Sequence, residues 1–280
     1  MTEGGRDAAV SRPLAGCRVV VTRPRSQAGL LEELLLARGA TVVALPTITI
    51  AAPASYDSLD AALKDLAAGG YEWIAFLSVN AVEQVLARLH QLALDVEIVG
   101  RARVVAVGGA TAEALSSSGV AVDLVPDDFT AAGVATALGP GTGSVLVPRA
   151  ADAPAAALDP LRSEGWQVDE AVAYRTEIGG DAGEAEAVRQ RGFDVVTFTS
   201  GSTARGFAAI VGVARAGLAP GDPGERKVAC IGPATAKVAT GLGFRVDAIA
   251  AEHSAEGLVQ AVVELRTSSD NEPQDGTMEP

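Results

Sequence analysis

The chain has 280 residues, 48% hydrophobic and 20% charged, a composition typical of a globular protein with one large or two ordinary domains. Its 22 Lys and Arg residues against 35 Asp and Glu residues give a net charge of −13, which argues against general binding to nucleic acid or to a membrane surface, because both need a basic face. With only two cysteines and two histidines, a disulfide framework and a Cys-rich metal site are excluded, a transition-metal site is disfavoured, and both thiols are expected to be buried.

Strands and helices alternate along the first half of the chain. Short β-branched runs predict strands at 17–22, 41–45, 47–50, 71–77, 103–107 and 122–125. Runs rich in leucine and alanine predict helices at 28–38, 80–92, 110–117 and 130–138. Ser26 is the expected N-cap of the first helix and Gly39 its stop. This alternation predicts parallel sheets covered by helices on both faces.

The two ends of the chain are expected to be disordered tails. Residues 1–13 lack the apolar core of a secretion signal, and residues 267–280 are polar and acidic. No apolar run approaches the ~18 residues that a membrane helix needs. The sequence therefore predicts a cytoplasmic protein.

Three blocks of sequence recur in the same order at nearly one spacing. The period is far longer than the ~20–50 residues of a solenoid repeat, so it predicts two similar α/β domains. Two lobes of this kind commonly hold a ligand in the cleft between them. The blocks begin at Arg18 and again at Ser144, at Tyr71 and again at Phe193, and at Val104 and again at Val228.

Four junctions between a predicted strand and the next helix are rich in glycine and hydroxyl residues. In open parallel sheets, ligands bind beyond the carboxyl ends of the strands, where helix N-termini offer N–H groups to carboxylates or phosphates. The alternative is that these hydroxyl groups only cap helices. The candidate binding residues at these junctions are Ser78, Asn80, Gly108, Thr111, Ser200, Ser202 and Thr235.

Other chemical signals are weaker. Arg23 and Arg149 hold equivalent positions in the repeat, just after a strand; each suits the surface, and together they could face an acidic ligand across a cleft. The fingerprints of dinucleotide-binding folds, P-loops and nucleophile elbows are all absent from the sequence. His253 next to Ser254 is weak evidence for nucleophilic catalysis and more simply marks a helix start capped by Ser254.

Eight short motifs follow one another in a fixed order along the chain. They are Val19-Val-Val-Thr-Arg-Pro24, Leu45-Pro46, Trp73-Ile-Ala-Phe-Leu-Ser-Val-Asn-Ala81, Ala106-Val-Gly-Gly-Ala-Thr-Ala112, Ala173-Tyr174, Phe198-Thr-Ser200, Cys230-Ile-Gly-Pro-Ala-Thr-Ala236 and His253-Ser-Ala-Glu-Gly-Leu258. In this order they resemble the uroporphyrinogen-III synthase family. The resemblance runs from about Cys17 to Leu265, and Leu77 stands where the family often has threonine.

The resemblance implies an α/β fold that a linear reading of the repeat would mispredict. Two similar parallel-sheet domains, Rossmann- or flavodoxin-like, are joined by a two-stranded extended linker, with a cleft between them. The chain begins the first domain, builds the second, and returns to finish the first. The implied boundaries are 14–45 plus 178–266 for domain 1, 55–168 for domain 2, 46–54 and 169–177 for the linker strands, and 1–13 and 267–280 for the tails.

The implied reaction is the cyclisation of hydroxymethylbilane, a linear tetrapyrrole, to uroporphyrinogen III, with inversion of the last pyrrole ring and loss of water. The resemblance implies no cofactor and no metal. It assigns Tyr174 as the catalytic group that helps the hydroxyl leave, with Thr22, Arg23, Arg149 and the junction residues binding substrate. It further implies a monomer that receives its substrate in a transient handover from hydroxymethylbilane synthase and binds neither nucleic acid nor membrane.

Alternatives stay open at this point. The chain could be a two-lobed protein that binds an anion or a tetrapyrrole without catalysis, or a different enzyme on the same layout, such as a lyase with a carboxylate in its cleft. The polar, acidic segment after Leu265 disfavours a DNA-binding regulator. Tyr174 itself could be a half-buried strand residue with a packed ring and a hydrated hydroxyl.

Overall fold

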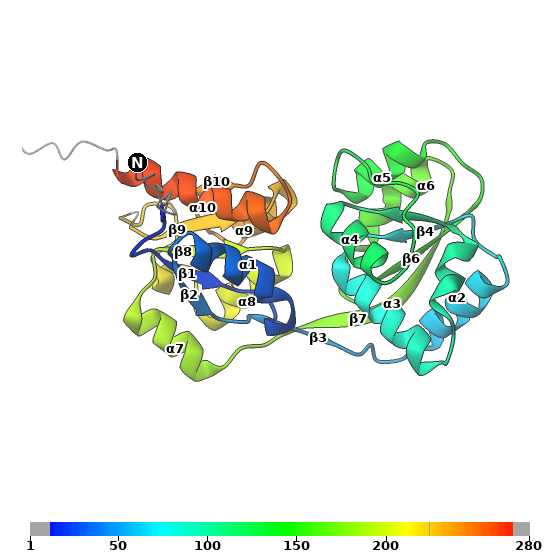
Figure 1. Ribbon diagram of the computed structural model, residues 1–280, viewed down its shortest axis with the longest axis horizontal. Helices are drawn as coiled ribbons and strands as arrows, with labels where there is room; N and C mark the ends of the chain where they lie inside the picture. Colours follow the sequence, from blue (N-terminus) through cyan, green and yellow to red (C-terminus); the bar gives the residue numbers. More distant parts are fainter. Residues whose placement is uncertain (1–11, 224, 271–280) are drawn as a thin grey trace, which may run out of the picture. The chain divides into compact units, whose positions relative to one another are not determined.

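The computed structural model describes residues 12–223 and 225–270, and the chain divides into two compact units (Figure 1). Unit 1 contains the chain up to Ile48 and from Ile178 onward, and unit 2 is Thr49–Glu177. Unit 2 is therefore inserted into unit 1 along the sequence, and the chain crosses between them twice. Each unit contains one five-stranded sheet with helices around it, which confirms the predicted α/β fold class.

The sheet of unit 1 has the strand order β10-β9-β8-β1-β2, and all of its neighbouring strands run parallel. Helices α1 and α10 cover one face, and α7, α8 and α9 cover the other. Both faces are buried, so the central strands are mostly apolar and do not alternate between apolar and polar residues. The elements are β1 (Arg18–Val21), α1 (Arg25–Ala37), β2 (Thr41–Ala44), α7 (Ala182–Arg191), β8 (Val195–Phe198), α8 (Gly201–Ile210), a 3-10 helix (Ala214–Ala216), β9 (Lys227–Cys230), α9 (Pro233–Gly241), β10 (Ala248–Ile249) and α10 (Ala255–Asp270).

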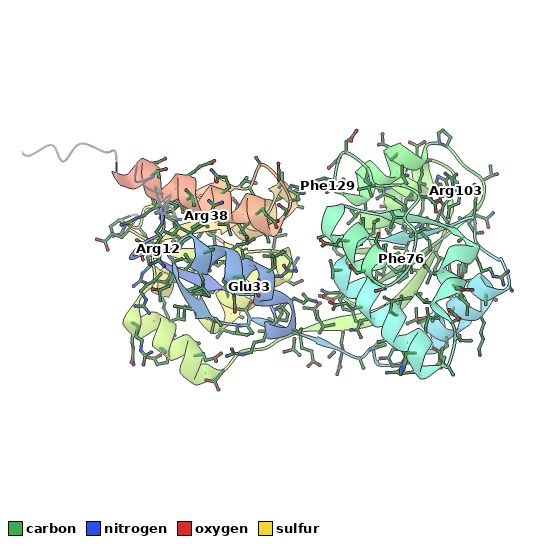
Figure 2. The ribbon with its side chains drawn as sticks, in the orientation of Figure 1. Arg12, Glu33, Arg38, Phe76, Arg103 and Phe129 are labelled. Atoms are coloured by element: carbon green, nitrogen blue, oxygen red, sulfur yellow. The ribbon has the colours of Figure 1, made fainter. Side chains whose placement is uncertain are left out.

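The sheet of unit 2 has the order β3-β7-β6-β4-β5. Helices α2, α3 and α4 cover one face, whose core includes Phe76 (Figure 2), and α5 and α6 cover the other. The elements are β3 (Ile48–Ala51), α2 (Asp57–Ala67), β4 (Trp73–Phe76), α3 (Val79–Gln91), a 3-10 helix (Val96–Arg101), β5 (Arg103–Ala106), α4 (Gly109–Ser117), α5 (Ala131–Leu138), β6 (Ser144–Ala150), a 3-10 helix (Ala155–Leu158), α6 (Asp159–Ser163) and β7 (Gln167–Ile178).

The sequence repeat corresponds to the same sheet built in two chain orders. Strands β9, β8, β1 and β2 of unit 1 lie in the order that β5, β4, β6 and β7 follow in unit 2. In unit 1 the pair β1 and β2 comes first in the chain, whereas in unit 2 the equivalent pair β6 and β7 comes last. Unit 2 is inserted after β2, which explains why the two pairs of strands occur in opposite chain order in the two units.

Three local predictions differ from the structure at the ends of elements. The predicted strand 122–125 is reduced to a single bridge at Leu124, because the Asp123 carboxylate accepts the Val104 N–H at 2.7 Å and occupies that donor. Ser26 is not an N-cap: helix α1 begins at Arg25 after Pro24, whose fixed φ of −51° suits a helix start. The segment expected as linker from 169 begins inside the sheet, since β7 pairs with β6 from residue 167 onward.

In the first half of the chain, helix α2 is missing from the predicted elements, and near the C-terminus helix α10 runs further than expected. Helix α2 has buried Leu59, Leu63 and Leu66 at helical spacing, a signal that the sequence contains. Helix α10 extends to Asp270 and so includes 267–270, which the sequence analysis assigned to a tail. The remaining tail residues, 1–11 and 271–280, lie outside the described residues. Among those described, no helix has the length and apolar composition needed to cross a membrane.

The two cysteines are unpaired and fully buried, which confirms the prediction for them. Burial raises the pKa of Cys17 to about 11 and that of Cys230 to about 12, so both remain neutral thiols at neutral pH. We expect neither to react with iodoacetamide in the native protein at pH 8, and both to react once urea unfolds it. Mass spectrometry of the alkylated protein would reveal this, and a native adduct at either position would contradict the expectation.

Candidate functional site

The carboxyl edge of the unit 2 sheet has the topology of a ligand site. From β4 the chain continues to β5 on one side of the sheet, whereas β6 and β7 lie on the other side. The chain thus adds strands first on one side of β4 and then on the other, which makes a topological switch point between β4 and β6. In open α/β sheets, ligands bind at such a point, outside the carboxyl ends of the strands. The loops there begin at Leu77, after β4, and at Ala151, after β6.

A β-bulge in β7 directs Tyr174 to this edge. The register of β6 and β7 passes from Arg149 opposite Val172 to Ala150 opposite Tyr174, which leaves Ala173 as an extra residue. Regular alternation would place Ala173 and Tyr174 on opposite faces, yet both pack in the core that α2 and α3 cover. Bulges reorient side chains in this way and are frequent beside active sites.

The Tyr174 hydroxyl lies at the N-terminus of helix α3. Its ring is buried, with 6% of the residue exposed, and its Oη lies 3.1 Å from Ser78 Oγ. Ser78 is the N-cap of α3, and its Oγ accepts the Ala81 N–H at 3.1 Å. Asn80 in the first turn of α3 also hydrogen-bonds Tyr174. Protein groups therefore bond this hydroxyl.

The surroundings keep the phenol protonated. Burial raises the pKa of Tyr174 above the usual value of a tyrosine, and the Asp152 carboxylate acts in the same direction. The hydrogen bonds from Ser78 and Asn80 and the positive charge of Arg149 oppose this shift. Tyr174 is therefore uncharged at neutral pH and can donate a hydrogen bond or a proton. Ser78, Asn80 and Arg149 favour the phenolate that is left when the proton is given up.

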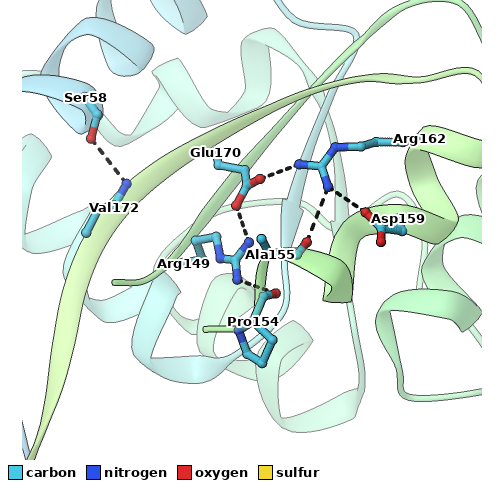
Figure 3. A network of polar contacts seen from close by, with 8 residues as sticks. All are labelled: Ser58, Arg149, Pro154, Ala155, Asp159, Arg162, Glu170 and Val172. Carbon is cyan, nitrogen blue, oxygen red and sulfur yellow. Dashed lines mark hydrogen bonds and ion pairs between the residues drawn. The ribbon is translucent and has the colours of Figure 1, made fainter. Parts of the chain in front are cut away.

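Arg149 is buried and already paired. It lies inside β6 and is 8% exposed, so the predicted position just after a strand is wrong, and the surface alternative does not apply to it. Its guanidinium forms an ion pair with Glu170 and donates from Nη2 to the Pro154 carbonyl at 2.8 Å (Figure 3). Glu170 also pairs with Arg162, whose Nη1 lies 3.0 Å from Asp159 Oδ1. One carboxylate thus holds two guanidinium groups at this edge of the sheet.

Helix α4 begins differently from α3. Its N-cap is the buried Gly108, and no side chain caps it. Thr111 lies in the first turn and is buried, so it does not act as the cap that the sequence allowed for. In unit 1, Gly232 and Thr235 hold the same two places at the start of α9.

The remaining candidates belong to unit 1. Ser200 caps α8 in a capping box with Thr203, which confirms a capping role, and Ser202 is half-buried in the first turn. Thr22 is fully buried, and its hydroxyl donates to the Thr197 carbonyl at 2.7 Å. Arg23, the next residue, is half-buried.

The structure thus brings Ser78, Asn80 and Tyr174 together in unit 2, with Arg149 near enough to affect the phenol. The sequence analysis missed Asp152 and Glu170, although Glu170 lies four residues before Tyr174 on the same strand. Within residues 12–223 and 225–270, no three side chains of His, Cys, Asp or Glu come close enough together to hold a metal ion.

Known proteins with similar sequences and folds point to one family. The family described as "Uroporphyrinogen-III synthase HemD" matches residues 30–260. A uroporphyrinogen-III synthase of Synechococcus elongatus is 31% identical over 262 residues, 90% of this chain and 96% of that protein. A putative uroporphyrinogen-III synthase of Methanothermobacter thermautotrophicus is 32% identical over 234 residues, covering 78% of this chain and 86% of that protein.

Two solved structures share the fold. A variant uroporphyrinogen III synthase of Thermus thermophilus aligns with a TM-score of 0.60 at 18% identity, covering 90% of this chain and 99% of the other. The uroporphyrinogen-III synthetase of Helicobacter pylori aligns with a TM-score of 0.55 at 17% identity, covering 89% and 99%. These TM-scores support the shared architecture, and the family match over most of the chain supports the assignment to a family. This chain belongs to the uroporphyrinogen-III synthase family.

Proposed function

We propose that this protein converts hydroxymethylbilane into uroporphyrinogen III with loss of water, and that Tyr174 is its catalytic residue. The observation that carries the proposal is a buried phenol whose hydroxyl lies 3.1 Å from Ser78 Oγ, in the loop after β4 at the carboxyl edge of the unit 2 sheet, in a chain of this family. Burial raises the pKa of this phenol, so it keeps its proton at neutral pH. A phenol can donate a proton to a departing oxygen and is uncharged at neutral pH.

The proposed reaction begins at the terminal hydroxymethyl group of the linear substrate. The carbon–oxygen bond breaks, its electron pair leaves with the oxygen, and the Tyr174 proton completes a water molecule. The substituted carbon of the last pyrrole ring then attacks the resulting azafulvene cation, and the new carbon–carbon bond gives a spiro intermediate. That ring then fragments and recloses inverted, and the proton released on final rearomatisation restores the phenol. Since the substrate also cyclises unaided to the symmetrical isomer, the protein must chiefly hold a folded, near-attack shape.

The other proposed roles follow from position. Ser78 and Asn80 hold the phenol and stabilise its developing negative charge. The substrate carries carboxylates, which suit the Arg149 guanidinium and the first turn of α4, with Gly108 and Thr111. In unit 1 we propose that substrate carboxylates are bound by Arg23, Ser200, Ser202 and Thr235. We also propose a cytoplasmic monomer that receives its substrate from hydroxymethylbilane synthase.

Separation of product isomers tests the function. The protein is incubated with enzymatically generated hydroxymethylbilane, and the products are oxidised and resolved by chromatography. We expect the type III isomer in excess over a protein-free control. Type I alone, with the protein folded, would contradict the synthase proposal and leave the alternative of a tetrapyrrole-binding protein without catalysis.

Replacing Ser78 should slow the reaction through Tyr174. Ser78 Oγ already accepts the Ala81 N–H, so its own proton is available to the phenol oxygen. Ser78→Ala removes a donor to a developing phenolate and should lower the single-turnover rate about tenfold. Ser78→Thr keeps the hydroxyl and should retain most of the rate.

The control separates this effect from the loss of a helix cap. Asp181 caps α7 and accepts the Glu184 N–H at 2.8 Å. Asp181→Ala and Ser78→Ala should lower the melting temperature to a similar extent, because each removes an N-cap that contributes about 1 kcal/mol of stability. Asp181→Ala should leave the single-turnover rate unchanged. Equal rates for Ser78→Ala and the wild type would reject the assigned role.

A further inference from the structure

The loops that lead into α5 and α10 repeat one motif. Residues Asp128-Phe-Thr-Ala-Ala-Gly-Val134 and Glu252-His-Ser-Ala-Glu-Gly-Leu258 match in order, 124 positions apart. In each copy the hydroxyl residue caps the helix: Thr130 Oγ1 accepts the Gly133 N–H and Ser254 Oγ the Gly257 N–H, both at 3.0 Å. The residue before the cap is a flat ring in both, Phe129 in unit 2 and His253 in unit 1.

Each of these rings lies against a glycine. A Cβ placed on Gly108 would lie 3.2 Å from Phe129 Cδ1, and one on Gly232 would lie 2.4 Å from His253 Nε2. The φ angles of the two glycines are −174° and −175°, an extended conformation that any residue adopts. Glycine is therefore favoured at both positions by the space that the ring occupies, not by its backbone freedom; a Cβ would overlap the ring at Gly232 and would crowd it at Gly108.

The two glycines place both rings at the carboxyl edge of a sheet. Gly108 follows β5 and begins α4, and Gly232 follows β9 and begins α9. Neither helix has a side-chain cap, in contrast to α3 and α8, which Ser78 and Ser200 cap. Each ring thus stands beside a helix N-terminus whose first turn has no cap of its own.

The exposure of Phe129 is unusual for its type. The residue is 37% exposed, whereas Phe76, Phe198, Phe207 and Phe244 are fully or almost fully buried. Figure 2 labels Phe129 at the margin of unit 2, on the loop before α5. His253 is half-buried. Both rings thus retain surface that another flat group could cover.

We propose that Phe129 and His253 are substrate-binding residues, each of which stacks on a pyrrole ring while the adjacent N-terminus of α4 or α9 receives a carboxylate arm of that ring. The inference rests on the proposed function and adds to it a recognition unit that occurs once in each half of the molecule. Stacked or edge-to-face aromatic pairs contribute beyond their buried area, and helix N-termini favour anions. A pyrrole with acid side chains presents both features a few ångströms apart.

The competing explanation is a hydrophobic staple. A residue before an N-cap often packs on the residue four positions after the cap, here Val134 or Leu258. A leucine serves a staple as well as a ring does, and histidine is a poor choice for one. Phenylalanine and histidine share a flat ring rather than polarity, so substitution by leucine separates the two explanations.

The test measures binding without turnover. Uroporphyrinogen III, kept reduced under anaerobic conditions, is titrated calorimetrically into the wild type and into Phe129→Leu and His253→Leu. Each leucine variant should bind about threefold to tenfold more weakly, with an unchanged melting temperature. The exchanges Phe129→His and His253→Phe keep a ring at each position and should bind within about twofold of the wild type.

Each outcome decides between the explanations. Leucine variants that bind as the wild type does would overturn the stacking proposal and leave the staple. The proposal would also be overturned if Phe129→His and His253→Phe lost as much affinity as the leucine variants. The identity of the side chain, rather than the presence of a ring, would then determine binding. If the wild type makes the type III isomer and only the stacking result fails, the proposed function stands. If the wild type makes type I alone, the function fails independently of the rings.

Discussion

Replacing Tyr174 with phenylalanine should lower the single-turnover rate about 100-fold while the product remains the type III isomer. General acid assistance contributes about 10²–10⁴-fold, and the substrate loses its hydroxyl without help at a measurable rate, so the low end applies. The buried ring stays in place, because only the hydroxyl and its bonds to Ser78 and Asn80 are lost. Substrate should therefore still bind in the shape that sets the isomer.

The pH dependence follows from the direction of the Tyr174 pKa. Burial raises it above the usual value of a phenol, so the donor form predominates through neutral pH and is lost only in strong alkali. The wild-type rate of hydroxyl loss should therefore not fall between pH 7 and 9 through this group. A rate that declines in this window, and does so equally in Tyr174→Phe, would assign the titration to another residue.

Tyr71 supplies the matched control. It is the other buried tyrosine of unit 2, and its hydroxyl donates to the Asp169 carboxylate. Tyr71→Phe removes a buried phenolic hydroxyl of the same kind and should lower stability without changing the rate. Full activity in Tyr174→Phe would mean that its hydroxyl is structural and that the shape of the bound substrate alone drives the reaction. A 100-fold loss in both variants would point to damage to unit 2 as a whole.

Replacing Glu170 with leucine should lower the free energy of unfolding of unit 2 by about 2 to 3 kcal/mol. The change leaves the buried Arg149 guanidinium bonded to the Pro154 carbonyl but without the Glu170 counter-charge. Breaking a buried pair by removing one member costs about 3–5 kcal/mol, and Glu170, at 30% exposed, is partly solvated, which reduces the figure. Both tryptophans of the chain, Trp73 and Trp166, are buried in unit 2, so their fluorescence during urea unfolding reports on this unit.

Two further variants identify the cause. Arg162→Ala removes the partner of Glu170 that is 39% exposed and should cost less than about 1 kcal/mol. Arg149→Met combined with Glu170→Leu replaces both charges with apolar groups and should recover most of the stability, because the uncompensated charge is then gone. A Glu170→Leu variant as stable as the wild type would show that water reaches the Arg149 guanidinium.

Local pattern was sufficient for most of the secondary structure. Strands β1, β4 and β5 and helices α3 and α4 lie where β-branched runs and helical spacing predict them, because both faces of each sheet are buried and the runs stay apolar. The capping roles of Ser78, Ser200 and Ser254 also follow from sequence, since an N-cap bonds an N–H only three residues away. The ends of α1 and α10 and the predicted strand 122–125 were misjudged, because short elements depend on neighbours as much as on their own residues.

The sequence by itself determined the α/β class, the two-fold repeat and, through its ordered motifs, the family. Only the tertiary structure decided which candidates share a site. The bulge at Ala173 turns Tyr174 to the face where Ser78, 96 positions earlier in the chain, caps α3. The same strand pairing buries Arg149 against Glu170, and close packing seals Thr22 inside unit 1. Periodicity specifies which face of its own element a residue takes, whereas a register shift or a contact between distant strands depends on how the whole sheet packs.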